Sequence, residues 1–189
     1  MIEAFSNVAT SFGLSTAAGL NAYLPLLVVA LVARYSNLIT LNEPWDVMTN
    51  GWVIAALGIL LFIEMTVDKI PAVDTMNDTI QTVGRPLSGA ILFAANSGVI
   101  GELHPAMAFV AGLILAGGVH AVKTVSRPAI TAVTVGTGNW FVSLVEDIVA
   151  LVTTILSLVL PIIMASLIVI GMVSLGLHWR KQRARPKQT

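Results

Sequence analysis

The sequence predicts an all-α protein, a polytopic transmembrane helical bundle of about six membrane segments, some of them short or broken. Its composition is the first reason. Hydrophobic residues make up 56% of the 189 positions and charged residues only 11%, whereas a soluble domain carries about 25% charged residues. The mean hydropathy is +0.88. Because so little polar surface is available to face water, we expect the lipid bilayer to be the partner that surrounds this chain.

Apolar runs separated by polar connections are the second reason, because a spanning helix needs roughly 20 mostly apolar residues. In order, these runs are residues 14–32, 52–67, 87–100, 106–122, 129–145 and 148–179. The first run contains many small residues and Pro25, so close helix packing or a local break is expected in it. The last run exceeds one crossing and contains Pro161, which leaves a kinked helix and a hairpin open. If the acidic connection 35–51 lies outside and the basic tail inside, the positive-inside rule requires an even number of crossings, which favours a single sixth helix. Four spans with re-entrant segments are the alternative.

The charges are spread unevenly, although the formal net charge is zero. Half of the basic residues crowd into the last ten positions, namely Arg180, Lys181, Arg183, Arg185 and Lys187. Because this tail follows an apolar run, a membrane-surface anchor is favoured over nucleic-acid binding. We expect residues 1–179 to form one transmembrane domain and residues 180–189 a basic cytoplasmic tail, with both termini cytoplasmic. The chain has no cysteine, which excludes disulfides and thiolate metal sites.

A short motif occurs twice and predicts an internal helical-hairpin repeat. Residues 82–86 (TVGRP) and 124–128 (TVSRP) match at four of five positions. Aligning them places the run 87–100 over residues 129–142, so each Arg-Pro pair is expected to precede a helix that enters the membrane. Duplicated helical units are a common way to build transporter folds.

The first group of charged residues lies around the end of the run 52–67. Glu64 and Asp68 are four residues apart, as are Asp74 and Asp78, so each pair would share a helix face and repel unless a cation or basic side chain lay nearby. Pro71 fits the first turn of a second helix. An ionisable residue within an apolar run is costly and usually functional; the alternative is a solvated cytoplasmic loop. The candidate site residues here are Glu64, Asp68, Lys69, Asp74, Asp78 and Arg85.

The second group follows the run 106–122. Glu146 and Asp147 are expected to begin the last helix, where the helix dipole alone would account for two acidic residues. The glycine-rich residues 136–139 predict a break that lines a cavity or is buried by protein. Asn21, in the first run, is expected to hydrogen-bond between helices, with solute contact as the alternative. The further candidate site residues are thus Asn21, His120, Lys123, Arg127, Asn139, Glu146 and Asp147.

These motifs resemble those of the bacterial membrane proteins grouped as domain of unknown function 4126. The resemblance covers nearly the whole chain, and Trp140 departs from it where a proline would be expected. It implies a membrane fold, a bacterial inner membrane and shared polar motifs, and it implies no substrate. The residues that carry it are 18–25 (AGLNAYLP), 68–74 (DKIPAVD), Asp78, Thr82, Arg85, Pro86, His120, Lys123, Arg127, Thr131, Thr134, Gly136, Asn139, Ser143, Glu146 and Asp147.

Three functional classes follow from these residues. The first is a small transporter or channel-like protein for an anionic solute or a lipid headgroup, in which the basic groups attract the anion and Glu64 and Asp68 carry a proton or cation. The second is a non-catalytic assembly or regulatory subunit whose charges pair helices. The third is an intramembrane enzyme with a metal held by Asp68, Asp74 and Asp78 that acts on a phosphorylated lipid. We rank transport first and expect no enzyme and no resident cofactor; a divalent cation at the aspartates and a homo-oligomer are left open.

Overall fold

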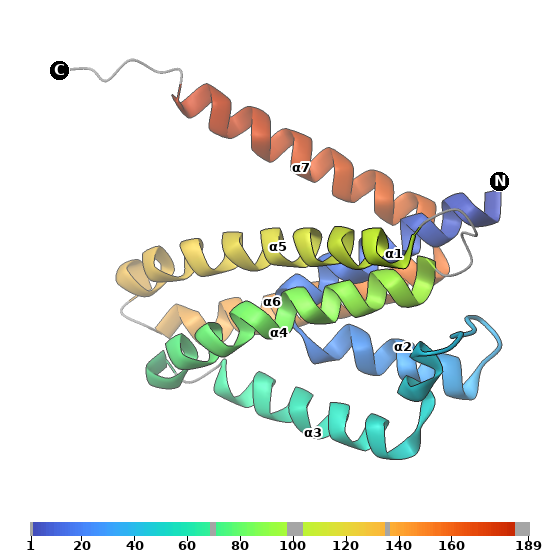
Figure 1. Cartoon of the computed structure of the whole chain (residues 1–189). Coiled ribbons are helices and arrows are strands. Elements are labelled where there is room, and N and C mark those ends of the chain that lie inside the picture. The colour runs from blue at the N-terminus through green and yellow to red at the C-terminus, as the bar shows by residue number, and fades with distance from the viewer. Residues whose placement is uncertain (1, 69–70, 98–103, 135–136, 184–189) are drawn as a thin grey trace.

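The computed structural model describes residues 2–68, 71–97, 104–134 and 137–183, and all the regular structure in these ranges is helical (Figure 1). The all-α prediction is therefore confirmed. The elements are α1 (Ile2–Leu20), α2 (Tyr23–Tyr35), the short 3-10 helix η1 (Trp45–Thr49), α3 (Gly51–Val67), α4 (Pro71–Ser97), α5 (Pro105–Thr134), α6 (Thr137–Val159) and α7 (Pro161–Arg183).

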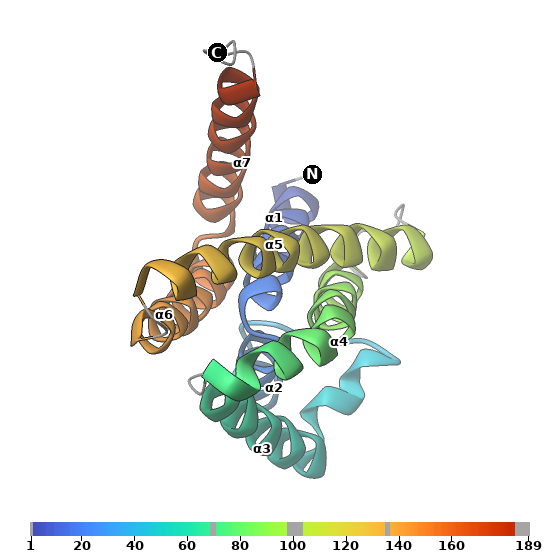
Figure 2. The ribbon, with the colours of Figure 1, turned by 90° about the vertical axis from the view of Figure 1, so that its left-hand side faces the viewer.

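Helix α1 lies at the centre of the bundle, where it contacts α4, α5, α6 and α7. Helices α4 and α5 lie side by side and run in opposite directions, and α3 lies on the far side of α4 from α5 (Figures 1 and 2). Helix α7 turns back after α6 and diverges from the other helices. The loop that contains η1 closes the end of the bundle formed by α2 and α3.

Small residues allow the central helices to approach closely. A methyl group added at Gly112 would lie 2.3 Å from the carbonyl oxygen of Gly89, and one added at Gly19 would lie 2.6 Å from the carbonyl oxygen of Ala116. The hydroxyl of Ser15 donates to the carbonyl oxygen of Gly89 at 2.8 Å. The close packing predicted for the small residues of the first run is thus confirmed. Such contacts are typical of helix interfaces in membranes.

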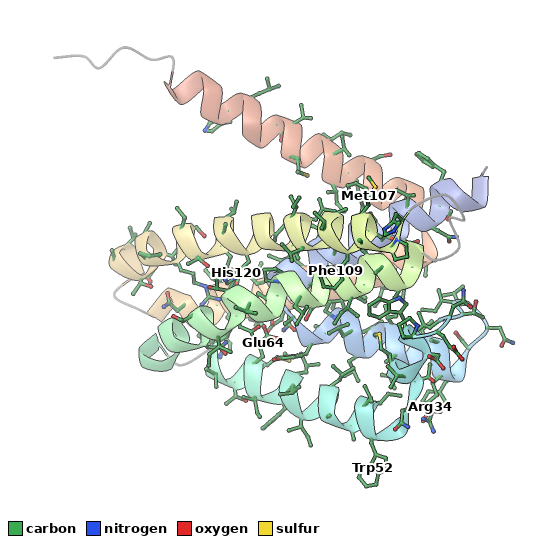
Figure 3. The ribbon with its side chains drawn as sticks, in the orientation of Figure 1. Arg34, Trp52, Glu64, Met107, Phe109 and His120 are labelled. Carbon is green, nitrogen blue, oxygen red and sulfur yellow. The ribbon has the colours of Figure 1, made fainter. Side chains whose placement is uncertain are left out.

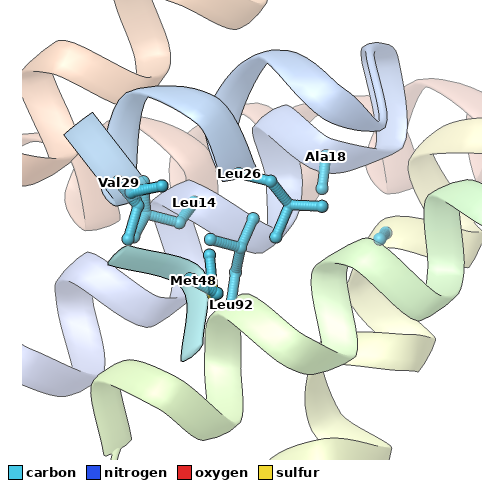
Figure 4. Packing of buried hydrophobic residues seen from close by; sticks show 8 residues of the cluster. Leu14, Ala18, Leu26, Val29, Met48 and Leu92 are labelled. Carbon is cyan, nitrogen blue, oxygen red and sulfur yellow. The ribbon is translucent and has the colours of Figure 1, made fainter. Parts of the chain in front are cut away.

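The main apolar cluster is small and lies between α1, α2, η1, α4 and α5 (Figure 4). Many large apolar side chains lie instead on the outside: Trp52 is 86% exposed and Val125 is 77% exposed. Polar side chains occupy the interior, where Arg85 is 0% exposed. Charged residues are almost never fully buried unless they are paired, so partners for these side chains are expected.

The structure corrects several predicted segment boundaries. The run 14–32 is divided between α1 and α2, at the local break that Pro25 and the small residues predicted. The run 129–145 is not one crossing, since α5 ends at Thr134 and α6 begins at Thr137. The single sixth helix predicted for residues 148–179 is also wrong, because α6 ends at Val159 and α7 begins at Pro161. A proline lacks the N–H of a helix interior but is well placed in a first turn.

Neither Arg-Pro pair begins a helix, which corrects the prediction made from the repeated motif. Pro86 lies inside α4 and Pro128 lies inside α5. A proline removes one backbone hydrogen bond from a helix interior, and in α4 and α5 extensive packing against neighbouring helices offsets that loss. The hairpin repeat itself stays a prediction.

Two described helical segments are long and apolar enough to cross a membrane on length and composition alone, Pro105–Thr134 and Gly138–Val159. Three other apolar helical segments are shorter, namely Tyr23–Tyr35, Gly51–Val67 and Ser166–His178. The predicted count of six membrane segments is therefore not confirmed.

A buried charged network as the candidate functional site

Charged side chains from α3, α4, α5 and α6 meet inside the bundle, away from the end that carries Arg34 and Trp52 (Figure 3). We call this set the charged network. All its members are buried except Glu146, whose side chain is 15% exposed. Burying charges is unfavourable unless each is paired and hydrogen-bonded. The network consists of Glu64, Asp68, Arg85, Lys123, Arg127 and Glu146, with Asn21, Asn77, His120 and Asp147 attached by hydrogen bonds.

Glu64 joins the break between α1 and α2 to α4. Its carboxylate accepts from the backbone N–H of Ala22 at 3.1 Å and from that of Tyr23 at 3.4 Å. These amides have no partner within the helix because they belong to the start of α2, where the helix dipole also favours a negative charge. On its other side the carboxylate accepts from Arg85, at 3.3 Å from Nε and 3.2 Å from Nη2.

Asn21 completes the start of α2 and links it to α6. Its Oδ1 accepts from the backbone N–H of Leu24 at 2.9 Å and from that of Tyr23 at 3.2 Å, as a helix-capping side chain does. Its Nδ2 donates to Oδ1 of Asp147 at 2.9 Å. The interhelical hydrogen bond predicted for Asn21 is confirmed.

Lys123 occupies the other side of the break. Its ammonium donates to the carbonyl oxygen of Leu20, the last residue of α1, at 3.3 Å. It also lies 3.1 Å from Asp68 and 3.0 Å from Glu146. The negative end of α1 thus faces a cation, while the positive end of α2 faces the Glu64 carboxylate, so both helix dipoles at the break are matched by charge.

Asp68 lies where the three basic side chains converge. Its Oδ2 is 3.1 Å from Lys123 Nζ, 3.2 Å from Arg85 Nη2 and 4.0 Å from Arg127 Nη2. Its Oδ1 accepts from Asn77 Nδ2 at 2.6 Å. Burial disfavours the ionised form of Asp68, but Lys123 and Arg85 outweigh that effect and hold the pKa of Asp68 below its ordinary value.

His120 extends the network beyond Arg85. Its Nδ1 lies 3.1 Å from Arg85 Nη1. Because a guanidinium can only donate, Nδ1 is the acceptor in this contact. Nε2 lies 3.3 Å from the hydroxyl of Thr82, which comes from the same helix as Arg85.

The remaining contacts join α5 to α6. Arg127 donates to the carboxylate of Glu146. The hydroxyl of Thr131 donates to Oδ1 of Asn139 at 2.9 Å. Asn139 therefore joins α6 to α5 through Thr131. Glu146 and Asp147 lie well inside α6, which starts at Thr137, so the prediction that they begin the last helix and cap its dipole is wrong.

The family model described as domain of unknown function (DUF4126) matches residues 8–181, which include every residue of the network. The chain belongs to the DUF4126 family. The family resemblance expected from the motifs is thus confirmed. Searches of curated proteins and of solved structures each found no match. Since the description of DUF4126 names no activity, the function of this chain must be argued from its site.

Three predicted site positions of this DUF4126 chain are not tested. Lys69 and the side chains of Asp74 and Asp78 lie outside the described residues. Among the residues that are described, no group of three or more histidine and acidic side chains is arranged to hold a metal ion. The divalent cation considered for Asp68, Asp74 and Asp78 therefore stays a hypothesis.

Asn77 is the member of the site that sequence reasoning missed. It belongs to a polar stripe along the inner face of α4, where residues recur every three or four positions. The spacing of these residues along the chain is the signal in the sequence that marks Asn77. The buried stripe consists of Asn77, Gln81, Arg85 and Ser88.

The repeated motif brings two arginines to one place in this DUF4126 fold. Residues 82–86 lie at the middle of α4 and residues 124–128 toward the end of α5. Because the two helices are neighbours, Arg85 and Arg127 both reach Oδ2 of Asp68, at 3.2 Å and 4.0 Å. The packing of α4 against α5 therefore brings the arginines of the two repeated motifs together.

Proposed function

We propose that this protein is an integral membrane protein that transports a small anionic solute or moves an anionic lipid headgroup, with the charged network as its site. We place it in a bacterial inner membrane with both termini on the cytoplasmic side. The proposal assigns no catalytic residue and no resident cofactor.

The distribution of polarity supports the membrane location. A protein in water rarely exposes large continuous apolar surface, yet Trp52 and Val125 lie on the outside and the charges lie within. In the two helices of spanning length, only 22% and 33% of the most apolar window is buried. A core helix of a soluble domain would be mostly buried. Lipid around the bundle accounts for both the apolar exterior and the polar interior.

The observation that carries the transport proposal is the broken helix at the charged network. Discontinuous helices in transporters bind ions and charged solutes through the free ends of their half-helices. Here the amides at the start of α2 bind Glu64, and the carbonyl oxygen of Leu20 at the end of α1 binds Lys123. Non-helical backbone at membrane depth is tolerated where protein buries it or where it lines a cavity.

A second candidate is a non-catalytic membrane subunit. The direct contact of each basic side chain with a carboxylate favours it. Arg85, Lys123 and Arg127 each contact a carboxylate of another helix. Such pairs hold helices in one arrangement, and they would serve a purely structural role without any solute.

Reconstitution distinguishes the two candidates. Purified protein in liposomes of phosphatidylethanolamine and phosphatidylglycerol is tested for uptake of labelled acetate and phosphate, and for translocation of a fluorescent phosphatidylglycerol. We expect transport of one class, and we expect Arg85→Gln to abolish it while Arg34→Gln, an exposed arginine at the opposite end, retains it. If wild-type vesicles move none of these anions while Arg85→Gln lowers thermal stability, the subunit candidate replaces transport.

A further inference from the structure

The carboxylate of Asp68 is bound in the way that a protein binds a small oxyanion. Two cationic donors lie 3.1 Å and 3.2 Å from one of its oxygens, and an amide donates to the other. These donors come from two different helices, α4 and α5. Arginine, lysine and amide N–H groups are the donors that recognise carboxylates and phosphates in proteins.

We propose that the side chain of Asp68 is a built-in substitute for the transported anion. A small oxyanion of the carboxylate or phosphate class binds to Arg85, Lys123 and Asn77 at the place that the Asp68 carboxylate occupies, after that side chain has withdrawn. This inference rests on the proposed function and deepens it by naming the class of ligand and the group that it replaces.

Each cationic donor is held in position by partners other than Asp68. Arg85 also binds Glu64 through Nε and Nη2, and Lys123 also binds Glu146 and the carbonyl oxygen of Leu20. The donors therefore keep their places when Asp68 leaves, so the anion site is organised before the ligand arrives. Such preorganisation lowers the cost of binding.

The position of Asp68 suits a group that is exchanged. It follows directly after Val67, the last residue of α3, so it lies at the end of that helix and not within it. Glu146, which shares Lys123 and Arg127 with it, is the network member that reaches the surface.

Exchange of one anion for another has a consequence for protons. Among the described residues, Asp68 faces Arg85 and Asn77 on α4, and Lys123 and Arg127 on α5, with Glu64 on its own helix and Glu146 beyond Lys123. When a solute neutralises the basic groups, burial is left to act on the displaced carboxyl, and its pKa rises. A withdrawn Asp68 that stays away from water therefore takes up a proton. Binding of the solute anion is thus coupled to binding of one proton.

Chemical rescue tests the site directly. Asp68→Ala is purified in detergent, and its thermal unfolding is followed in chloride, formate, inorganic phosphate and a short-chain phosphatidic acid at equal ionic strength. We expect Asp68→Ala to unfold at a lower temperature in chloride and to be restored by formate or phosphate. The half-maximal concentration should be about tenfold or more below that for the wild type, which must first displace its own carboxylate. Rescue by phosphatidic acid alone identifies the lipid headgroup as the source of the anion.

Asp46→Ala is the matched control, because Asp46 is an exposed aspartate of η1 outside the network. If Asp68→Ala does not fold, Asp68→Asn keeps the shape of the side chain without its charge and should bind formate more tightly than the wild type. The wild type itself should bind formate more tightly at about pH 5 than at about pH 7.5, by up to about tenfold per pH unit for one coupled proton. Equal responses of the folded Asp68 variant, the wild type and Asp46→Ala, with no effect of pH, would overturn the inference.

The rescue experiment tests the anion site, and the flux experiment tests transport, so a negative result in one leaves the other proposal standing. Rescue of Asp68→Ala without any flux through wild-type vesicles leaves the anion site standing and removes the transport function. Flux that depends on Arg85, without rescue, leaves transport standing and shows that Asp68 does not occupy the anion position.

Discussion

The carboxylate of Glu64 lies 3.1 Å from the backbone nitrogen of Ala22, so a side chain of α3 caps a helix that begins in the interior of the bundle. This contact joins the break between α1 and α2 to the charged network. The same carboxylate binds Arg85. The start of α2 and the ion pair between α3 and α4 therefore depend on each other.

Glu64→Gln should destabilise the protein strongly. The amide keeps the size of the side chain, but it leaves the fully buried Arg85 with one compensating charge fewer. Breaking a buried ion pair typically costs about 3–5 kcal/mol. Thermal unfolding in detergent measures the effect, with the exposed Glu43→Gln as the control. Equal unfolding temperatures for the two variants would contradict the role given to Glu64.

Substitutions of Asn21 should separate its two hydrogen-bonding roles. Asn21→Ser keeps a capping oxygen for the start of α2 and loses the bond to Asp147, whereas Asn21→Ala loses both. Loss of a helix cap typically costs about 0.5–2 kcal/mol, so we expect Ala to be the more destabilising of the two by an amount in that range. Chemical denaturation in mixed micelles is the measurement. If Asn21→Ser is less stable than Asn21→Ala, the capping oxygen contributes little to stability.

Two glycines of α5 should respond oppositely to the same substitution. A methyl group at Gly112 meets the backbone of α4 at 2.3 Å, whereas nothing lies within 4 Å of one at Gly118. Gly112→Ala should force α4 and α5 apart and lower the unfolding temperature. Gly118→Ala should leave it unchanged or raise it, since alanine is favoured over glycine in a helix by about 1 kcal/mol. Similar effects of both variants would contradict the helix packing described for α4 and α5.

Anion uptake should be coupled to protons through Asp68. In the resting protein Lys123 and Arg85 keep the pKa of Asp68 low against the effect of burial, so the group is ionised near neutral pH and becomes protonated only when the solute anion replaces it. Lowering the pH outside wild-type vesicles should therefore accelerate uptake. Asp68→Asn should remove this dependence on pH. A pH dependence that survives in Asp68→Asn would assign the coupled proton to another group.

The polar residues of the site show how far the sequence could be interpreted. Nine of the predicted candidates take part in the network, because ionisable groups in apolar surroundings are costly and so stand out in a sequence: Asn21, Glu64, Asp68, Arg85, His120, Lys123, Arg127, Glu146 and Asp147. Asn77 was missed because it lies in a polar stretch of the sequence, where an amide does not stand out as Asn21 does within an apolar run. Helix boundaries were predicted less well, since Pro86 and Pro128 suggested helix starts at places where packing keeps the helices continuous.

The helical class of this chain follows from its composition and from the spacing of its polar residues, because both are local properties of the amino-acid sequence. The same spacing identifies most of the residues of the charged network. The tertiary structure alone decided which of them meet: Lys123 is 55 residues from Asp68 along the chain and 3.1 Å from it in space. That contact depends on how closely α4, α5 and α1 approach at their small residues, and this distance is set by packing between helices.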